Sequence, residues 1–140
     1  MLRVNLATLV IAVIGCCTGT PGAVADNSYC TAVGKYCAFY SPSHRVDCEI
    51  NTGGYAGPDS VYCKTVEPPQ SVHMANTGSF YTCTGDSCLG NAAQGIPTLA
   101  YGQTTALGPF SCLSEVSGVT CTAAQGHGFV ISTSGIASVG

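Results

Sequence analysis

Residues 110–121, with the sequence FSCLSEVSGVTC, decide the fold. Each of the two cysteines, Cys112 and Cys121, follows an apolar residue by two positions, and in a β-strand two such residues lie on one face. We expect a four-residue loop over 115–118, built on a type I turn in which the glycine adopts a positive φ. This loop places Cys112 opposite Cys121, so the segment predicts a hairpin closed by a cross-strand disulfide.

The pattern of an apolar residue two places before a cysteine recurs at Cys48 and Cys63. The connection between these two segments contains residues 52–58, TGGYAGP, which are rich in turn-forming glycine and proline. The sequence therefore predicts a second hairpin, with a Cys48–Cys63 disulfide.

Four further cysteines are assigned by the same preference for neighbours. Cys83 and Cys88 bracket residues 84–87, TGDS, a turn-forming set, and this leaves Cys30 to pair with Cys37. Eight cysteines allow 105 pairings, and pairing between neighbours is the simplest hypothesis. Because each closure stabilises a fold by roughly 2 to 4 kcal/mol, we expect reduction to unfold the chain.

The rest of the chain also has the pattern of an all-β protein. Short period-2 segments are separated by glycine, proline and asparagine every eight to twelve residues or so. They lie at residues 71–74, 79–83, 98–101 and 129–132. We expect a small antiparallel, disulfide-stapled sheet or a partly open barrel of short hairpins. Residues 26–36 are expected to form a helical turn or an irregular arm, and residues 134–140 a loose tail.

The first 25 residues have the features of a secretory signal peptide. Arg3 precedes an apolar stretch too short to span a bilayer, and the small residues of Ala23-Val24-Ala25 form a cleavage pattern. Cleavage after Ala25 leaves residues 26–140 as a single disulfide-rich domain outside the cytoplasm, with an even number of cysteines. The alternative is a lipoprotein anchored through Cys16, which resembles a lipobox cysteine.

Charge content and cysteine spacing argue against nucleic acid and metal ions as ligands. Charged residues make up only 8% of the chain, with 4 Lys and Arg against 7 Asp and Glu, so nucleic acid is not expected to bind. The spacing of Cys83 and Cys88 is at the edge of that seen for zinc ligands, but no second pair of ligands completes a site. We therefore expect no metal and no cofactor.

One group of residues has the composition of a hydrolase site: Ser41, Ser43, His44, Asp47 and Glu49. If Cys48 faces the core, Asp47 and Glu49 lie on the solvated face of one strand, and His44 has the other parity. This geometry favours an ordinary solvated strand face over a catalytic triad or carboxylate pair.

His127, between Gly126 and Gly128, is the best single candidate for a catalytic residue. Flanking glycines allow the backbone to approach a ligand closely, although they more often mark a bulge or a bend. His73 is expected on the polar face of a strand. Most of the seven tyrosines are expected to fill the core or cover disulfides.

Five segments, in this order along the chain, resemble a group of small secreted cysteine-rich proteins of actinobacteria, particularly mycobacteria. They are SPSHRVDCEI at 41–50, VYC at 61–63, LAYG at 99–102 leading to GPFSC at 108–112, GVTC at 118–121, and GHGFVIS at 126–132. Many members have Gly-Asn where this chain has His44-Arg45, and an arginine where it has Thr133. The resemblance implies export and association with the cell envelope, and it implies no catalytic residue.

Together these patterns favour a secreted, non-catalytic binding or structural module whose partner is an envelope or host protein or a glycan. The first alternative is a secreted hydrolase that uses His127 or His44. The second is a protease inhibitor that presents residues 51–60 as a rigid loop.

Overall fold

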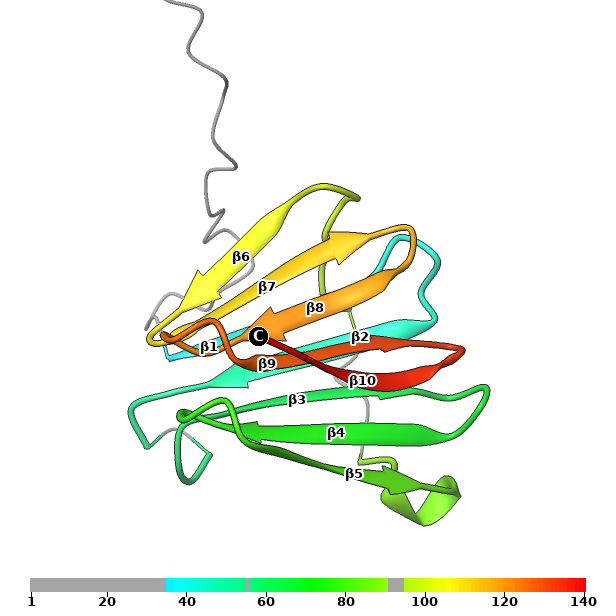
Figure 1. Cartoon of the computed structure of the whole chain (residues 1–140). Coiled ribbons are helices and arrows are strands. Elements are labelled where there is room, and N and C mark those ends of the chain that lie inside the picture. Colours follow the sequence, from blue (N-terminus) through cyan, green and yellow to red (C-terminus); the bar gives the residue numbers. More distant parts are fainter. Residues whose placement is uncertain (1–34, 55, 91–94) are drawn as a thin grey trace, which may run out of the picture.

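The computed structural model describes residues 35–54, 56–90 and 95–140, which form two antiparallel sheets of five strands each (Figure 1). The first sheet contains β1 (Tyr36–Tyr40), β2 (Val46–Asn51), β3 (Ser60–Thr65), β4 (Gln70–Ala75) and β5 (Phe80–Thr84). The second contains β6 (Thr104–Leu107), β7 (Phe110–Glu115), β8 (Gly118–Thr122), β9 (Gly128–Ser132) and β10 (Gly135–Val139). The prediction of an all-β, antiparallel, disulfide-stapled fold is confirmed.

Each sheet is a simple meander in which strands that follow one another in the chain are hydrogen-bonded neighbours. A single long connection links the two meanders. It begins with a 3₁₀ turn, η2 (Asp86–Cys88), and its last part pairs briefly with β1, where Leu99 N donates to Tyr40 O. Tyr62 and Lys64 fasten this connection, because the Tyr62 hydroxyl donates to Cys88 O and Lys64 Nζ donates to Gly90 O.

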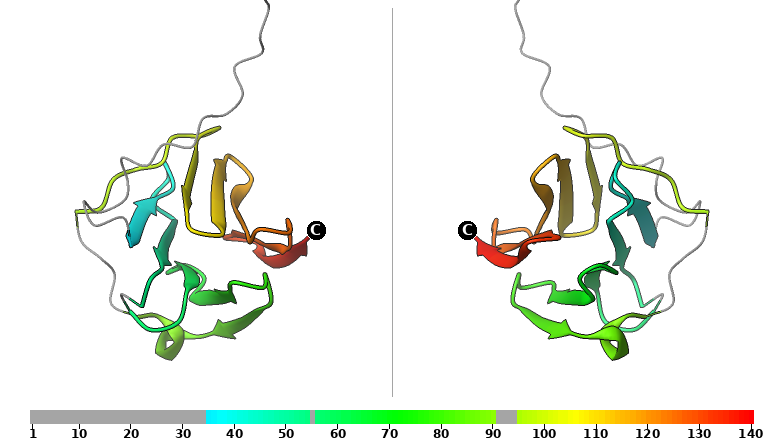
Figure 2. Two further views of the ribbon diagram at one scale, coloured as in Figure 1. Left: turned by 90° about the vertical axis from the view of Figure 1, so that its left-hand side faces the viewer. Right: turned by 90° about the vertical axis from the view of Figure 1, so that its right-hand side faces the viewer.

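The two sheets face one another across one shared core (Figure 2). Alternation along each strand sends every second side chain inward, as in β2, where Val46, Cys48 and Ile50 are buried while Asp47 and Glu49 point outward and are only partly covered. The largest fully buried side chains come from both sheets: Phe39, Phe110, Phe129, Ile50, Met74, Leu99 and Ile131.

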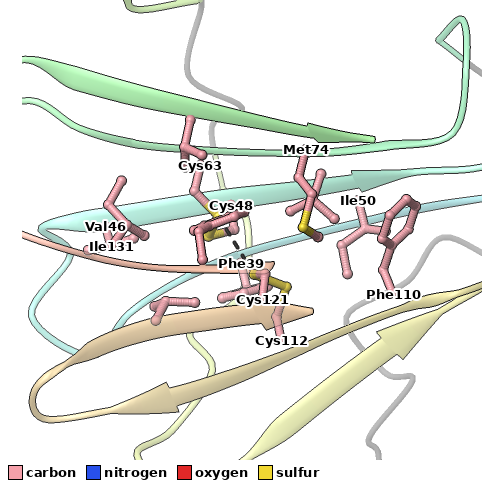
Figure 3. Packing of buried hydrophobic residues seen from close by; sticks show 14 of the residues in the cluster. Phe39, Val46, Cys48, Ile50, Cys63, Met74, Phe110, Cys112, Cys121 and Ile131 are labelled. Carbon is pink, nitrogen blue, oxygen red and sulfur yellow. Dashed lines mark hydrogen bonds between the residues drawn. A yellow bond between two sulfur atoms is a disulfide. The ribbon is translucent and has the colours of Figure 1, made fainter. Parts of the chain in front are cut away.

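Two disulfides lie at the centre of this core (Figure 3). Cys48–Cys63 joins β2 to β3, and Cys112–Cys121 joins β7 to β8, in each case between residues directly opposite in the sheet. All four residues are fully buried. The sulfurs of Cys63 and Cys121 lie 3.9 Å apart, so the two disulfides contact each other across the interface between the sheets.

The third described disulfide, Cys83–Cys88, lies outside the core and closes the turn after β5. These three bonds join the same cysteine pairs that were predicted from the sequence. Cys37 is also disulfide-bonded, while Cys30 and the predicted signal peptide, residues 1–25, lie outside the described residues. Among the residues that the structure describes there is no helix of the length and apolarity that a membrane span requires.

The β7–β8 hairpin has the expected register but a shorter turn. Cys112 pairs with Cys121 as predicted, whereas Glu115 and Gly118 are themselves paired, which leaves a two-residue turn instead of a four-residue loop. Gly118 has a φ of 144°. A Cβ on Gly118 would collide with the carbonyl of Ile131, so only glycine lets β9 lie so close to this end of β8.

Three other expectations about elements are wrong. The expected loose tail contains β10, whose Ile136 packs against the core beside β9. Residues 98–101 make one isolated bridge instead of a strand. Tyrosine is absent from the buried apolar residues of the described chain, because aliphatic side chains, phenylalanine and cystine fill the core.

Candidate functional site

Four connections between strands meet at one end of the molecule, at the right in Figure 1. They join β1 to β2, β3 to β4, β7 to β8 and β9 to β10, and Tyr101 lies beside the third of them. The connections β2–β3, β4–β5, β6–β7 and β8–β9 lie at the opposite end (Figure 1). We call the first end the serine-rich end, defined by residues 41–45, 66–67, 101, 115–118 and 132–134.

The serine-rich end contains a hollow of about 360 Å³. Half of its lining residues carry a hydroxyl group on an aliphatic side chain: Ser41, Ser43, Ser117, Ser132, Thr133 and Ser134. The others include one cation, Arg45, one carboxylate, Glu115, and one aromatic ring, Tyr101. The volume falls within the range of small-ligand sites, about 300 to 1,000 Å³.

Three further hollows adjoin this one. Ser117 lines the central hollow and two of its neighbours, one beside Tyr101 and one beside Ile136. Arg45 lines the central hollow and a third neighbour of about 280 Å³, which also contains Glu67. The central hollow therefore has neighbours on several sides of this end.

Exposed apolar side chains gather on the same end. The described chain has four large apolar residues with high exposure, and three of them lie here: Val66 (58%), Tyr101 (45%) and Val116 (83%). The fourth, Tyr81, lies on β5 and is 66% exposed. Exposed apolar groups that cluster beside polar ones are typical of binding surfaces.

Backbone contacts hold this end in shape. Gly102 N donates to Ser114 O over 2.7 Å and fixes Tyr101 beside β7. Val46 N donates to the Ser41 hydroxyl over 3.2 Å, which fixes the start of β2. Because these bonds lie within the chain, the fold itself fixes the backbone around the hollow, which lowers the cost of ordering it on binding.

Many polar groups around the hollow are uncommitted. The hydroxyls of Ser117, Thr133 and Ser134 donate no hydrogen bond to the described part of the chain and accept none from it. The same holds for the guanidinium of Arg45 and the carboxylate of Glu115, which form no ion pair with any described residue. All five groups face solvent and are available to a ligand.

His44, a candidate for catalysis, lies at the edge of the serine-rich end. Its φ of 57° is in the left-handed region, and its ring stacks on Tyr40 with centroids 4.7 Å apart. His44 Nε2 lies 3.0 Å from the Thr98 hydroxyl. A base and a hydroxyl are thus in contact, but the described residues supply no carboxylate to orient the imidazole through Nδ1.

His127 lies at the opposite end of the sandwich, so the structure does not bring the two candidate histidines together (Figure 1). His127 O accepts a hydrogen bond from Ala123 N and closes the tight β8–β9 turn, and Gly78 packs directly against it. The flanking glycines therefore serve a turn and a close backbone approach. The segment 51–60, considered above as an inhibitor loop, contains the β2–β3 connection at this end, where Gly53 N donates to the Asp59 carboxylate over 2.9 Å.

Asp47 and Glu49 point away from the core as expected, but Asp47 is not simply solvated. It pairs across the sheet with Lys64, which is only 3% exposed beneath the long connection. Burial raises the pKa of Asp47 from 3.8 to about 6; the charge of Lys64 lowers it and that of Glu49 raises it. His73 lies on the same outer face as expected and stacks on Tyr81.

Three sulfurs, those of Cys48, Cys63 and Cys121, lie within 4.8 Å of one another in the core. Each belongs to a disulfide, so none is a thiolate that could bind a metal in this oxidised state. The cluster is structural as drawn in Figure 3.

Sequence reasoning considered Ser41 and Ser43 but missed the rest of the serine-rich end. Ser117, Thr133 and Tyr101 come from three separate turns, and only the pairing of the strands brings them together. The available signal was the repeated occurrence of serine at successive hairpin turns. Comparison of the chain with models of protein families, with curated proteins and with solved structures finds no match.

Proposed function

We propose that the protein is an exported, non-catalytic binding module and that the serine-rich end is its ligand-binding surface. The observation that carries this proposal is that four adjoining hollows and three of the four exposed large apolar side chains of the described residues lie at one end; a smaller hollow lies apart, beside Tyr81. Such a preformed concave surface, with apolar and polar groups interspersed, is the usual form of a binding site.

Export is supported by the signal-like pattern of residues 1–25 and by the disulfides, which persist in oxidising compartments. The resemblance to secreted actinobacterial proteins adds the cell envelope as the place of action. Two cystines in the core of a small domain suit a protein that must remain folded outside the cell, where it is not refolded by chaperones.

The experiment measures retention of the protein by the envelope of the cell that makes it. Secreted wild type and the variant Tyr101→Ala are quantified in the washed envelope and in the medium. Tyr81→Ala is the matched control, because it removes another exposed tyrosine, 66% exposed against 45% for Tyr101, from a different surface. Thermal melts show that each variant is folded.

We expect Tyr101→Ala to move the protein from the envelope to the medium and Tyr81→Ala to leave the distribution unchanged. Val116→Ser, at the most exposed apolar side chain of the same end, should reproduce the loss without touching a packed residue. Equal retention of the wild type and both serine-rich-end variants would refute this surface as the binding site.

A second candidate function, a hydrolase based on His44, is favoured by one contact: the 3.0 Å distance between His44 Nε2 and the Thr98 hydroxyl. A panel of ester substrates tests it with wild type, His44→Ala and, as the control at the opposite end, His127→Ala. Turnover that is lost only in His44→Ala would establish catalysis at this edge of the serine-rich end.

A further inference from the structure

We propose that the ligand of the serine-rich end is a neutral oligosaccharide segment, with one sugar ring stacked on Tyr101. This inference rests on the proposed function and names its ligand class. It follows from three properties of the surface, namely its hydrogen-bonding groups, its balance of charge and its adjoining hollows.

The hydrogen-bonding groups match those of a sugar. A sugar hydroxyl is both donor and acceptor, and the uncommitted hydroxyls of Ser117, Thr133 and Ser134 have the same dual capacity. Arg45 adds a fork of donors and Glu115 a pair of acceptor oxygens. Tyrosine and arginine are enriched in the interfaces between proteins, whereas serine and glutamate are depleted there, so it is the hydroxyl-rich half of this lining that favours a polyol.

The balance of charge disfavours an anionic ligand. Arg45 is the one cation of the serine-rich end, whereas Glu115 and Glu67 are both acidic and line hollows that Arg45 also lines. A phosphate or carboxylate bound by Arg45 would therefore lie near two carboxylates, which costs electrostatic energy. A neutral ligand uses both kinds of charged group as hydrogen-bond partners without this repulsion.

Tyr101 supplies the apolar part of the site. One face of a sugar ring carries mainly C–H bonds and packs on an aromatic face, while its hydroxyls point sideways to polar neighbours. Tyr101 is 45% exposed, so its ring is accessible, and the Gly102 N to Ser114 O bond holds its backbone in place. Val116 extends the apolar rim beside it.

The set of adjoining hollows indicates more than one sugar. The hollow beside Ile136 shares Ser117 with the central one, and the hollow beside Val66 shares Arg45 with it. An isolated monosaccharide would fill only the central hollow, so we infer that successive units of a chain occupy the adjoining hollows.

The test separates a glycan from a protein ligand by the chemistry of each. Purified, folded protein is sedimented with three preparations of the envelope: untreated, digested with a protease, and oxidised with periodate followed by borohydride quenching. Periodate cleaves the bond between carbons that carry neighbouring hydroxyls, while the digestion removes accessible proteins. We expect binding to survive the protease and to be lost after periodate.

Variants then locate the sugar. Tyr101→Phe should retain binding to untreated envelope, because the ring is kept, whereas Tyr101→Ala should weaken it about tenfold or more. Arg45→Gln and Glu115→Gln should each weaken it, because each removes a charged hydrogen-bond partner, and Tyr81→Ala should not. Thermal melts again show that all variants are folded.

Each other outcome rejects a defined statement. Binding that survives periodate but not protease refutes the glycan and leaves the serine-rich end as a protein-binding surface, provided that Tyr101→Ala still abolishes it. Binding that is indifferent to Tyr101→Ala and Val116→Ser refutes the binding surface itself, whichever treatment removes it.

Discussion

Removal of the disulfides one at a time should show that each of the two core bonds stabilises the fold more than the peripheral bond does. The perturbation is replacement of both cysteines of a pair by alanine. Loop closure lowers the entropy of the unfolded chain by about 2.1 + 1.5R ln n cal/mol/K, where n is the loop length. The sequence separations are 15 for Cys48–Cys63, 9 for Cys112–Cys121 and 5 for Cys83–Cys88. At 25 °C these give about 3.0, 2.6 and 2.1 kcal/mol.

Burial widens this small difference. The cysteines of the two core bonds are 0% exposed, and truncation of each pair removes two buried sulfurs from the packed interior. If each sulfur is treated like a buried methylene, the loss adds about 1.6 kcal/mol per pair. We therefore expect losses of about 4 to 5 kcal/mol for either core bond and about 2 kcal/mol for Cys83–Cys88.

Urea unfolding followed by circular dichroism measures these losses for the three double variants. The native protein offers a second assay, in which mild reduction and alkylation are followed by mass. Cys83 is exposed at the surface, so its bond should be reduced first, while the two core bonds should resist until the fold opens. The reasoning is refuted if loss of Cys83–Cys88 destabilises as much as loss of a core bond, or if all bonds are reduced together in the native state.

Three further changes test individual contacts. The Ser114 hydroxyl is buried without a hydrogen-bond partner in the described chain, so Ser114→Ala should raise the free energy of unfolding in urea by about 1 kcal/mol. Burial raises the pKa of Asp47 to about 6, so the folded protein holds the proton of this carboxyl more tightly than the unfolded chain does. The resulting stabilisation is complete below the ordinary pKa of 3.8 and is lost as the pH rises to about 6. The melting temperature should therefore fall over this pH range in wild type and fall less in Asp47→Asn. A Cβ at Gly128 would overlap the carbonyl of Cys121, so calorimetry of Gly128→Ala should show a loss of about 3 kcal/mol or more in the free energy of unfolding. Gly90→Ala is the control and should cost little, because a Cβ at Gly90 would lie 3.8 Å from its nearest neighbour, the Tyr62 hydroxyl.

The hairpins could be predicted from the sequence because their signals are local. An apolar residue two places before Cys48, Cys63, Cys112 and Cys121 fixes which face of each strand is buried, and a one-residue slip would expose it. Turn residues between the cysteines then set the pairing.

Two strands with weak local patterns were not predictable in this way, although each pairs with its neighbour in the chain. Strand β10 pairs with β9, and its Ile136 packs against the core. Strand β1 is apolar but short, and its pairing with β2 joins segments whose connection contains the unusual backbone of His44. Local propensity contains no information on such tertiary contacts.

The serine-rich end could not be predicted from the sequence, because its residues come together only in the folded structure. Ser41 and Ser43 were considered as part of a triad with His44, whereas their neighbours in space are turns some 60 to 90 positions away in the chain. Most tyrosines were expected to fill the core or cover disulfides, an expectation that did not single out Tyr101. The position of Tyr101 depends on the Gly102–Ser114 contact, which no pattern in the sequence indicates.

The contact between the sulfurs of Cys63 and Cys121 makes the timing of oxidation important. Each core bond closes within one meander, so a hairpin that oxidises on its own can join only the right two thiols. Once the sheets have docked, four thiols share one confined space, and a wrong bond between the halves becomes geometrically accessible. We therefore expect maturation to be most accurate when each bond forms before the sheets dock, and the local, sequential pairing of the strands favours that order.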